Sequence, residues 1–505
     1  MESRAEDASE AEAFRFLSDE ALRAGGPGAV WTWAELRDRA RGVARELVES
    51  GAVGRGARVL LVYPAGLEFV AAFLGCLYLG AVPVPVSPPR RREKPGRWAH
   101  ISQDAGVSAL LSAPGVISAM AGDPAPVPCI VSTAADPGRA WRPRPDDPAP
   151  RPLLPQDLAF LQYTSGSTGA PKGVMVTHGM LAANLEQIRK AFRFGPEDRI
   201  AGWLPPYHDM GLIGGILTPV HLGVPNAMMS PSAFLRDPIA YLELAGRLGA
   251  TIIGGPNFAY EHCLRHATPE ALARVDLSGL RFAFSGAETI RPDTLRRFQE
   301  VFAPCGFSPR RWVGCYGLAE ATLCVSVTPP GEGPGEGMRP FAARPGESAA
   351  PAESGAPAEG MEIAIVDPAT GARAPAGGTG EIWLRGPNIA PGYWGSPEAG
   401  AGMFDQLLDG GRGWLRTGDL GALQGGRLYV TGRLKELIVV RGRNHHPQDI
   451  EETAAAAHAD LAPGRAAAFA MEDGDGAFGL VCELTRRACR DPRPGPVFAA
   501  IRAAL

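Results

Sequence analysis

The loop at residues 163–173 carries the groups that would bind a phosphate. It reads YTSGSTGAPKG and follows an apolar run, LAFLQ, that predicts a strand. Glycine lets backbone N–H groups approach one anion closely, the hydroxyls add donors, and Lys172 adds a suitable positive charge. The spacing is not that of a Walker A loop, because neither Ser nor Thr follows the lysine. A flexible surface loop is the alternative, but such a loop would not need a lysine fixed beside a proline. The string therefore predicts a nucleotide-phosphate loop.

Three further polar segments have two interpretations each. In CYGLAEAT, Glu320 could hold a hard cation against phosphate oxygens and Tyr316 could stack on a base. In WLRTGDLG, Asp419 could bind the hydroxyls of a ribose. The structural alternatives are a half-buried glutamate, an aspartate that caps its own turn, and, for Arg433 in TGRLKE, a plain surface arginine. Taken singly, these residues leave both interpretations open.

Local patterns do not indicate a metal cluster or a nucleophilic triad. His262 and His266 lie one helical turn apart, but HCLRH lacks the glutamate of the zinc-protease pattern. The spacing of Cys305, Cys315 and Cys324 fits no metal site, and no GxSxG string surrounds a candidate serine. We expect structural roles for these residues.

The composition is that of a globular protein with more than one domain. A length of 505 residues exceeds what one core can organise, and 45% hydrophobic with 21% charged residues is ordinary. The net charge of −4 argues against nucleic acid as the main partner. An acidic N-terminus without an apolar core and scattered cysteines predict a cytoplasmic protein without a secretory signal. Residues 69–86 are broken by Gly80, Pro83 and Pro85, which predicts a buried helix and strand rather than a membrane span.

The elements that would position these polar residues follow a βαβ rhythm. WTWAELRDRARGVARELVESGA and GLEFVAAFLGCLYLG predict helices, and ARVLLVYP and AVPVPV predict buried strands. Two apolar strands with a polar segment between them are expected in AGWLPPYHDMGLIGGILTPVHLGVPNAMM. Further strands are expected in RFAFSGAETI and RRWVGCYGLAEATLCVSV, and a strand and turn in TIIGGPNFAY. This rhythm predicts mostly parallel sheets covered by helices, in which ligands bind at the carboxyl ends of the strands. The polar segments fall at such ends.

The last third of the chain changes character. Residues 329–360 are rich in Pro, Gly, Ala and Glu and by composition predict a linker or insertion. A small β unit with hairpin turns is expected next, from MEIAIV to EIWLRGP. A domain boundary is expected in residues 432–436, before further strands and a helix.

Taken together, these strings resemble those of the AMP-forming adenylating superfamily, which includes acyl-CoA ligases, luciferases and peptide-synthetase adenylation domains. Within it the chain is most similar to the fatty acyl-AMP ligases. The similarity spans residues 13 to about 500 and rests on YPAGLEFVAAFLGCLYLGAVPVP, LQYTSGSTGAPKGVMVTHGML, WLPPYHDMGLIGG, GGPNFAY, SGAETI, CYGLAEATL, GEIWLRGPNIAPGYW and GRLKELIVVRGRNHHPQDIE.

The resemblance implies a nucleotide site. The β- and γ-phosphates of ATP would contact Thr164, Ser165, Gly166, Ser167, Thr168, Gly169 and Lys172. The adenine would lie against Gly286, Ala287, Glu288 and the ring of Tyr316. Glu320 would bind Mg²⁺, and Asp419 would hold the ribose with help from Arg433.

The resemblance also implies a reaction and an acyl site. A fatty carboxylate would attack the α-phosphorus of ATP, giving acyl-AMP and pyrophosphate, with catalytic roles for Thr164, Lys172, His208 and Glu320. The acyl pocket would be bordered by His208, Asp209, Met210, Ile213 and Phe258. Residues 1–432 would form a large domain and residues 436–505 part of a small α+β domain, rotating about a hinge at Lys435.

Several features favour an acyl-AMP ligase over an acyl-CoA ligase. HDMGLIG, GGPNFAY, RGRNHHPQDIE and an insertion after CYGLAEATL occur in the former, and residues 329–360 occupy the insertion's position. In that family the insertion accompanies poor use of CoA. The resemblance therefore implies transfer of the acyl group to the phosphopantetheine of an acyl carrier protein.

The chain departs from the family pattern in two places. Thr289 stands where the family usually has proline after the adenine loop, and no lysine follows Lys435, although the family has a catalytic lysine near its C-terminus. We expect a truncated small domain. Without the catalytic lysine, we expect the adenylation rate of this 505-residue chain to be lower by a factor of roughly 10²–10³. Two other functions remain open: an acyl-CoA ligase, and a catalytically weak module that binds nucleotide or acyl-AMP.

Overall fold

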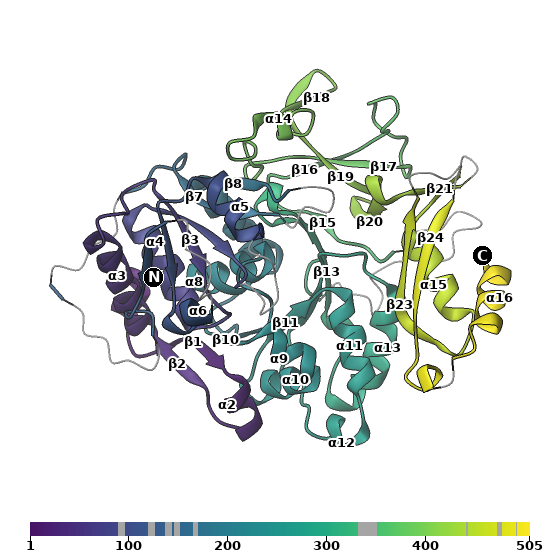
Figure 1. Cartoon of the computed structure of the whole chain (residues 1–505), viewed down its shortest axis with the longest axis horizontal. Coiled ribbons are helices and arrows are strands. Elements are labelled where there is room, and N and C mark those ends of the chain that lie inside the picture. The colour runs from purple at the N-terminus through teal and green to yellow at the C-terminus, as the bar shows by residue number, and fades with distance from the viewer. Residues whose placement is uncertain are drawn as a thin grey trace.

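The computed structural model describes residues 1–88, 96–119, 127–136, 144–145, 152–164, 170–331, 351–440, 443–471, 477–490 and 492–505. Among these residues the largest sheet has nine strands, and its central pairs are parallel (Figure 1). In spatial order the strands are β15 (Ala356–Pro357), β14 (Cys324–Val327), β13 (Trp312–Gly317), β12 (Phe282–Ser285), β11 (Ile252–Gly255), β9 (Ile200–Gly202), β10 (Asn226–Met229), β1 (Glu12–Leu17) and β2 (Ala29–Thr32).

A second parallel sheet lies nearer the N-terminus. Its strands are β4 (Val82–Val86), β3 (Arg58–Val62), β5 (Ala109–Ser112) and β6 (Cys129–Val131). The helix α3 (Trp33–Glu49) begins in a capping box, in which Thr32 and Glu35 bond each other's backbone N–H groups. The expectation of helix-covered, mostly parallel sheets is confirmed.

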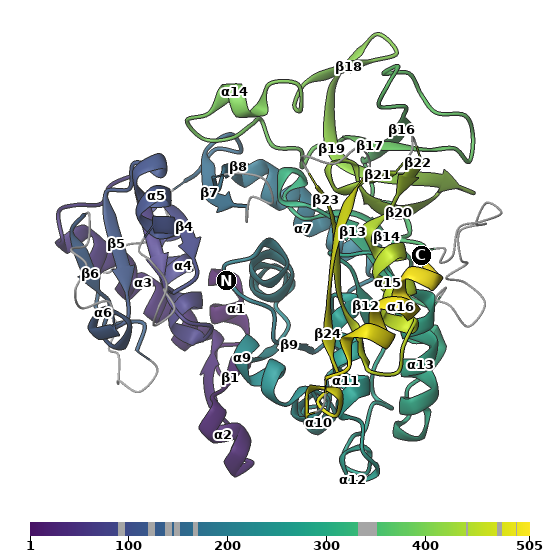
Figure 2. The ribbon, with the colours of Figure 1, turned by 45° about the vertical axis from the view of Figure 1, so that its right-hand side comes forward.

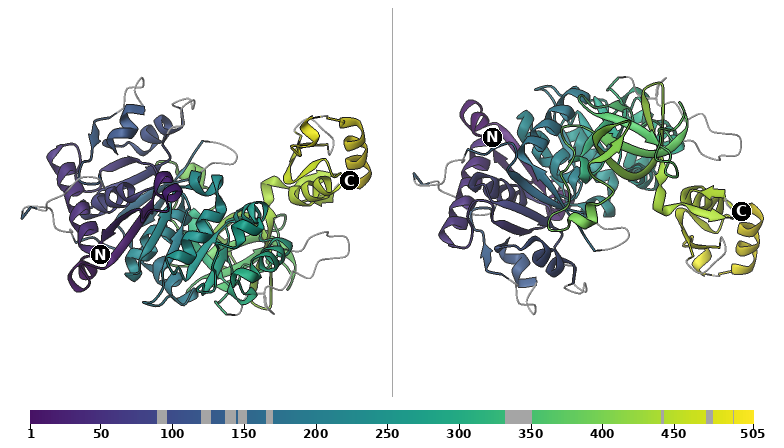
Figure 3. Two further views of the ribbon diagram at one scale, coloured as in Figure 1. Left: turned by 90° about the horizontal axis from the view of Figure 1, so that it is seen from below. Right: turned by 90° about the horizontal axis from the view of Figure 1, so that it is seen from above.

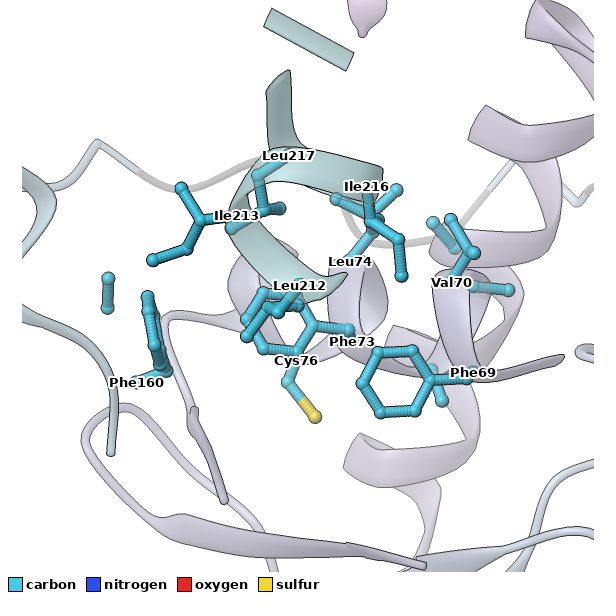
Figure 4. Close-up of a cluster of buried hydrophobic side chains, with 14 of the residues drawn as sticks. Phe69, Val70, Phe73, Leu74, Cys76, Phe160, Leu212, Ile213, Ile216 and Leu217 are labelled. Carbon is cyan, nitrogen blue, oxygen red and sulfur yellow. The ribbon is translucent and has the colours of Figure 1, made fainter. Parts of the chain in front are cut away.

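The helix α4 (Leu67–Leu79) is apolar on nearly all sides because it is buried on nearly all sides. It packs so closely on α3 that a Cβ on Gly75 would lie 2.7 Å from the side chain of Val43. On another side, Phe69, Phe73 and Leu74 meet a π-helix, η1 (Met210–Leu217), through Leu212 and Ile216 (Figure 4). Phe73 also stands edge-on to Phe160 at 5.7 Å between ring centroids. This apolar cluster anchors η1 against the rest of the molecule.

A small antiparallel β unit follows the large sheet, as predicted. It contains β16 (Glu362–Val366), β17 (Thr379–Arg385), β18 (Gln406–Leu408), β19 (Gly411–Gln424) and β20 (Arg427–Arg433). Figure 2 shows these strands gathered beyond the ends of β13 and β14. The hairpin of β7 (Leu158–Tyr163) and β8 (Gly173–Thr177) bonds to this part of the chain, since Trp394 N donates to Gly173 O.

The chain after β20 forms a separate lobe (Figure 3). It contains β21 (Ile438–Val440), β22 (Arg443–His445), α15 (Pro447–Ala456), β23 (Leu461–Ala470), β24 (Phe478–Leu484) and α16 (Pro494–Ala504). Residues 432–436, where a domain boundary is expected, comprise the end of β20 and the 3₁₀ turn Leu434–Glu436 that precedes β21. The boundary and rotation about it stay predictions. Of the helices in the described ranges, none has the length and apolarity needed to cross a membrane.

Two elements differ from the sequence-based expectation. The run GLIGGIL lies within the π-helix η1, and the residues expected as a turn after β11 begin the helix α11 (Asn257–His266). In η1, a Cβ on Gly211 would lie 2.0 Å from the carbonyl oxygen of Pro205, so the first turn requires glycine. The backbone N–H of Thr218 donates to Ile213 O, five residues earlier, which is the hydrogen bond of the wider π turn. Thr218 Oγ1 donates to the same oxygen at 2.8 Å.

Replacing Phe73 with alanine should destabilise the protein by about 3–5 kcal/mol, because the cavity left behind adds to the lost burial. Urea unfolding followed by tryptophan fluorescence measures the change. Leu154→Ala is the control, since Leu154 is 54% exposed and its loss should cost little. Equal midpoints for the two variants would contradict the packing described for α4 and η1.

Candidate active site

The two described ends of the predicted phosphate loop are held together in a hairpin. Thr164 N donates to Lys172 O at 3.0 Å, and Tyr163 OH donates to Asp104 Oδ2 at 2.5 Å. A Cβ on Gly173 would lie 2.8 Å from the Tyr163 ring, so glycine is required there. Ser165, Gly166, Ser167, Thr168 and Gly169 lie outside the described residues. Phosphate binding by this loop stays a prediction.

Tyr393 joins the lysine of this loop to Glu320. The Lys172 Nζ atom lies 5.0 Å from the centre of the Tyr393 ring and donates to Ala399 O at 3.4 Å. The Tyr393 hydroxyl donates to Glu320 Oε1 at 2.7 Å, and Ala390 N donates to the Glu320 carbonyl. Burial, followed by the charge of Glu320, raises the pKa of Tyr393, so it remains a donor. The loop and the carboxylate, far apart in sequence, are thus fixed to one side chain.

Asp419 and Tyr316 form a second polar contact. Tyr316 OH donates to Asp419 Oδ2 at 2.7 Å, and Arg433 Nε lies 3.0 Å from Asp419 Oδ1. Asp419 and Arg433 are directly paired across β19 and β20. Burial raises the pKa of Asp419, while Arg433 and the Tyr316 hydroxyl oppose that rise. The structure therefore brings together three residues that the sequence left ambiguous.

The segment predicted to line an adenine follows β12. A Cβ on Gly286 would lie 2.6 Å from Cys315 Sγ, and Ala287 has a φ of +66°. Such backbone conformations are uncommon for alanine and occur often at binding sites. Glu288 Oε1 accepts a hydrogen bond from Phe258 N at 2.5 Å, in the first turn of α11. Glu288 therefore also has a structural role as a partner of that helix end.

An apolar cavity of about 100 Å³ reaches this polar region. It lies among η1, the strands β9, β11, β12 and β13, and the helix α7 (His178–Ala191). Its lining includes Asp209, Ala287 and Tyr316 at the polar end. The apolar lining comprises Ile188, Phe192, Phe194, Ile200, Ile252, Phe282, Phe284 and Leu323, with Met210, Gly214, Thr218, Gly317 and the two thiols of Cys315 and Cys324.

The inner end of this cavity is aromatic. Phe192, Phe194 and Phe282 contact one another at 5.5 to 6.0 Å between ring centroids. Phe282 opens β12, whereas Ala287 follows the end of that strand, so the cavity runs from the carboxyl ends of the strands inward. It can hold a molecule with one polar end and a long apolar tail.

Asp209 marks the change from polar to apolar surroundings. It precedes η1 and accepts from Met210 N at 2.7 Å. Burial raises its pKa, the Met210 N–H and His208 act in the opposite direction, and Glu320 raises it further. Glu320 also raises the pKa of Asp419. The three carboxylates are therefore within electrostatic reach of one another.

The remaining predicted site residues are more dispersed. His208 is exposed, with its ring 5.9 Å from that of Tyr207. Phe258 is 42% exposed beside Trp203, and Lys435 is exposed in a 3₁₀ turn between β20 and β21. Ile213 is fully buried in the cluster with α4 (Figure 4) and does not line the cavity described above. Their predicted roles stay predictions.

A buried amide network supports the Glu320 turn and could not be recognised from sequence. Asn388 Nδ2 donates to Ala321 O at 2.7 Å and to Cys324 O at 3.1 Å. Thr322 has a φ of +63° and donates through Oγ1 to Asn388 O at 2.8 Å. Asn184, in α7, accepts a hydrogen bond from Cys324 N through Oδ1 at 3.0 Å and donates one from Nδ2 to Cys324 O. The strained turn next to Glu320 is thus fixed from two other elements.

Comparisons with known proteins agree with this geometry. The family model described as "AMP-binding enzyme" matches residues 1–394. A medium-chain-fatty-acid–[acyl-carrier-protein] ligase, JamA, from Moorena producens strain JHB is 39% identical over 470 residues, which are 87% of this chain and 78% of that protein. A long-chain-fatty-acid–AMP ligase, FadD26, from Mycobacterium marinum is 37% identical over 487 residues, covering 91% and 82%.

Solved structures are also similar. A fatty acyl-adenylate ligase from L. pneumophila, in complex with acyl adenylate and pyrophosphate, matches with a TM-score of 0.79 and 35% identity. The match covers 100% of this chain and 88% of that one. The expected similarity to fatty acyl-AMP ligases is confirmed.

Asn388→Leu should lower the free energy of unfolding by about 1–3 kcal/mol, because the buried carbonyls of Ala321 and Cys324 each lose one of their two donors. Chemical unfolding measures the loss. Gln424→Leu, an amide replaced at an exposed position, should change it little. If both variants unfold like the original protein, the network does not support the Glu320 turn.

Proposed function

Because the chain belongs to the AMP-binding enzyme family, we propose that it activates a fatty acid with ATP, forming acyl-adenylate and pyrophosphate, for transfer to an acyl carrier protein. The observation that carries the proposal is the apolar cavity whose polar end meets Asp209, Ala287 and Tyr316. A fatty acid has this distribution of polarity, with one carboxylate and an apolar tail. The JamA relative is named for transfer to a carrier protein, which supports that acceptor.

The residues present fit a bound Mg²⁺ ion. Glu320 has one oxygen held by Tyr393, and the described residues place no donor on the other. A carboxylate oxygen is a ligand that Mg²⁺ accepts, usually together with substrate phosphates. When bound, the cation would offset the negative charge of phosphate oxygens and of the nearby carboxylates. Glu320 would hold it, and Tyr393 would fix the orientation of Glu320.

The remaining residues position the two reactants. The cavity excludes water from the acyl tail and presents the carboxylate at its polar end. Asp419, oriented by Tyr316 and Arg433, keeps acceptor capacity for ribose hydroxyls. Lys172 and the loop N–H groups would bind the phosphates that leave as pyrophosphate. In-line displacement at phosphorus depends mainly on such positioning and charge stabilisation.

The reaction predicts pyrophosphate release that requires both ATP and a fatty acid. A medium- to long-chain acid with hydroxylamine should give acyl-hydroxamate. A phosphopantetheinylated carrier protein should accept the acyl group in preference to CoA. Equal or faster thioester formation on CoA would favour an acyl-CoA ligase. Tight binding of acyl-AMP without turnover would favour a nucleotide-binding module.

Tyr393→Phe should weaken the affinity of the enzyme for Mg²⁺. It removes one hydroxyl but keeps the ring beneath Lys172, so Glu320 loses a charge-assisted hydrogen bond worth about 1.5–3 kcal/mol. We expect the Mg²⁺ concentration for half-maximal rate to rise by roughly tenfold, since 1.4 kcal/mol corresponds to a factor of ten. Chelation should abolish the original activity.

The control for this substitution is Tyr429→Phe, a conservative replacement of another buried tyrosine in the β unit. The control should keep the original Mg²⁺ dependence. An unchanged Mg²⁺ profile in Tyr393→Phe, with normal folding by circular dichroism, would contradict the role assigned to Tyr393.

A further inference from the structure

A second, smaller cavity lies beside the acyl cavity, under the same π-helix. Its volume is about 40 Å³, and it shares Ile200, Met210, Gly214 and Phe284 with the acyl cavity. It extends away from β12 toward β10, where Asn226 and Met228 join its lining, and Gly215 of η1 also borders it. The two cavities are therefore adjacent, separated by shared residues that include the flexible side chain of Met210.

Strand register explains why this hollow exists. Ile200 pairs with Ile252 on one side and Asn226 on the other, and two residues further on Gly202 pairs with Met228. Gly254, two residues after Ile252, pairs with Phe284. Residues two apart on a strand share a face of the sheet. The paired residues named above therefore all lie on the face toward η1, and two neighbouring strands, β9 and β11, have glycine on that face. The missing side chain of Gly202 leaves the space, whereas the ring of Phe284 occupies the position that a Cβ on Gly254 would take.

One polar atom at this hollow lacks a partner. Asn226 is 1% exposed, and its Nδ2 donates to Gly215 O in η1. Its Oδ1 has no hydrogen-bond partner among the described residues. The opposite amide orientation would direct Oδ1 at a carbonyl oxygen, so the Gly215 contact fixes which atom faces the hollow. A Cβ on Gly202 would lie 3.8 Å from this oxygen. The free acceptor thus borders the space above Gly202.

We infer that the second cavity is a subsite for a hydroxyl group on the acyl chain of the substrate, with Asn226 Oδ1 accepting its hydrogen bond. The inference rests on the proposed function, because it concerns the acid that occupies the neighbouring cavity. A buried acceptor left without a donor is costly, so a substrate that supplies the donor is favoured over one that does not. The cavity lining within the described chain has no charged side chain, which favours a neutral hydroxyl over an ammonium group.

The size of the hollow limits the substituent. About 10–15 Å³ of cavity volume is needed to hold one group the size of a water molecule. The 40 Å³ of the second cavity therefore admits about three such groups. A hydroxyl or a short hydroxyalkyl branch fits, whereas a second long chain does not. Ordered water is the competing occupant and forms one outcome of the test.

The test compares unsubstituted fatty acids with acids of the same length that carry one hydroxyl at successive carbons. Pyrophosphate release at saturating ATP gives kcat/KM for each acid. For at least one position, the hydroxy acid should exceed its unsubstituted counterpart by about tenfold, the effect of one buried hydrogen bond. A ratio of one or less at every position, with good turnover of the unsubstituted acids, would overturn the inference and indicate water only. No turnover of any acid would instead overturn the proposed function.

Two substitutions test the subsite itself. Asn226→Leu removes the acceptor at similar volume, and Gly215→Ala places a methyl group where no atom lies within 4 Å. Both should reduce the hydroxy-to-unsubstituted ratio from about ten to about one. Gly115→Ala, in the helix α6 (Pro114–Ala119), also meets open space and should keep the original ratio. Retention of the preference in a folded Asn226→Leu or Gly215→Ala protein would overturn the assignment to this cavity.

Discussion

The site depends on one buried tyrosine that contacts side chains from two other parts of the chain. Tyr393, after β17, places its hydroxyl on Glu320 from the large sheet and its ring beneath Lys172 from the β7–β8 hairpin. Among the residues that the structure describes, neither Lys172 nor Glu320 has an ion-pair partner, and exposed ion pairs would hold them only weakly. A tyrosine ring attracts a cation to its face, and its hydroxyl donates a hydrogen bond to a carboxylate. One side chain therefore holds both the lysine and the glutamate. Because the small β unit supplies this ring, its packing against the large sheet determines the geometry of the site.

Polar and apolar chemistry meet along η1. Leu212 and Ile216 of η1 pack on α4, and the opposite side of η1 borders both cavities. Glycines at 211, 214 and 215 let the backbone lie close to neighbouring segments and leave room for a ligand. The helix begins at Asp209, where burial and the nearby Glu320 both raise the pKa of the carboxyl group. The helix η1 thus separates the cavity for an apolar tail from the charged residues of the reaction centre.

Local sequence predicted much of this arrangement. The βαβ rhythm, the buried α4, the hairpin unit and the similarity to fatty acyl-AMP ligases were all correct, because periodicity and short motifs record them. The family resemblance, rather than the local pattern, placed Asp419 and Arg433 at one site, and the two residues are directly paired across β19 and β20. Tyr393 and Asn388 received no roles, since their partners lie 64 to 73 residues earlier in the chain. The π-helix was missed because an apolar run with three glycines has no helical pattern. Ile213 was assigned to the acyl pocket by the family resemblance; it is buried beside α4, and its role stays a prediction.

The most direct test of acyl-adenylate binding in this cavity is a crystal structure with a stable acyl-adenylate analogue bound. We predict that the acyl chain runs from Asp209 toward the Phe192, Phe194 and Phe282 cluster, with the base beside Ala287 and Tyr316. We also predict that Tyr393 keeps its contact with Glu320 in the complex. An acyl chain lying outside this cavity, or a nucleotide bound away from Ala287, would contradict the proposed site.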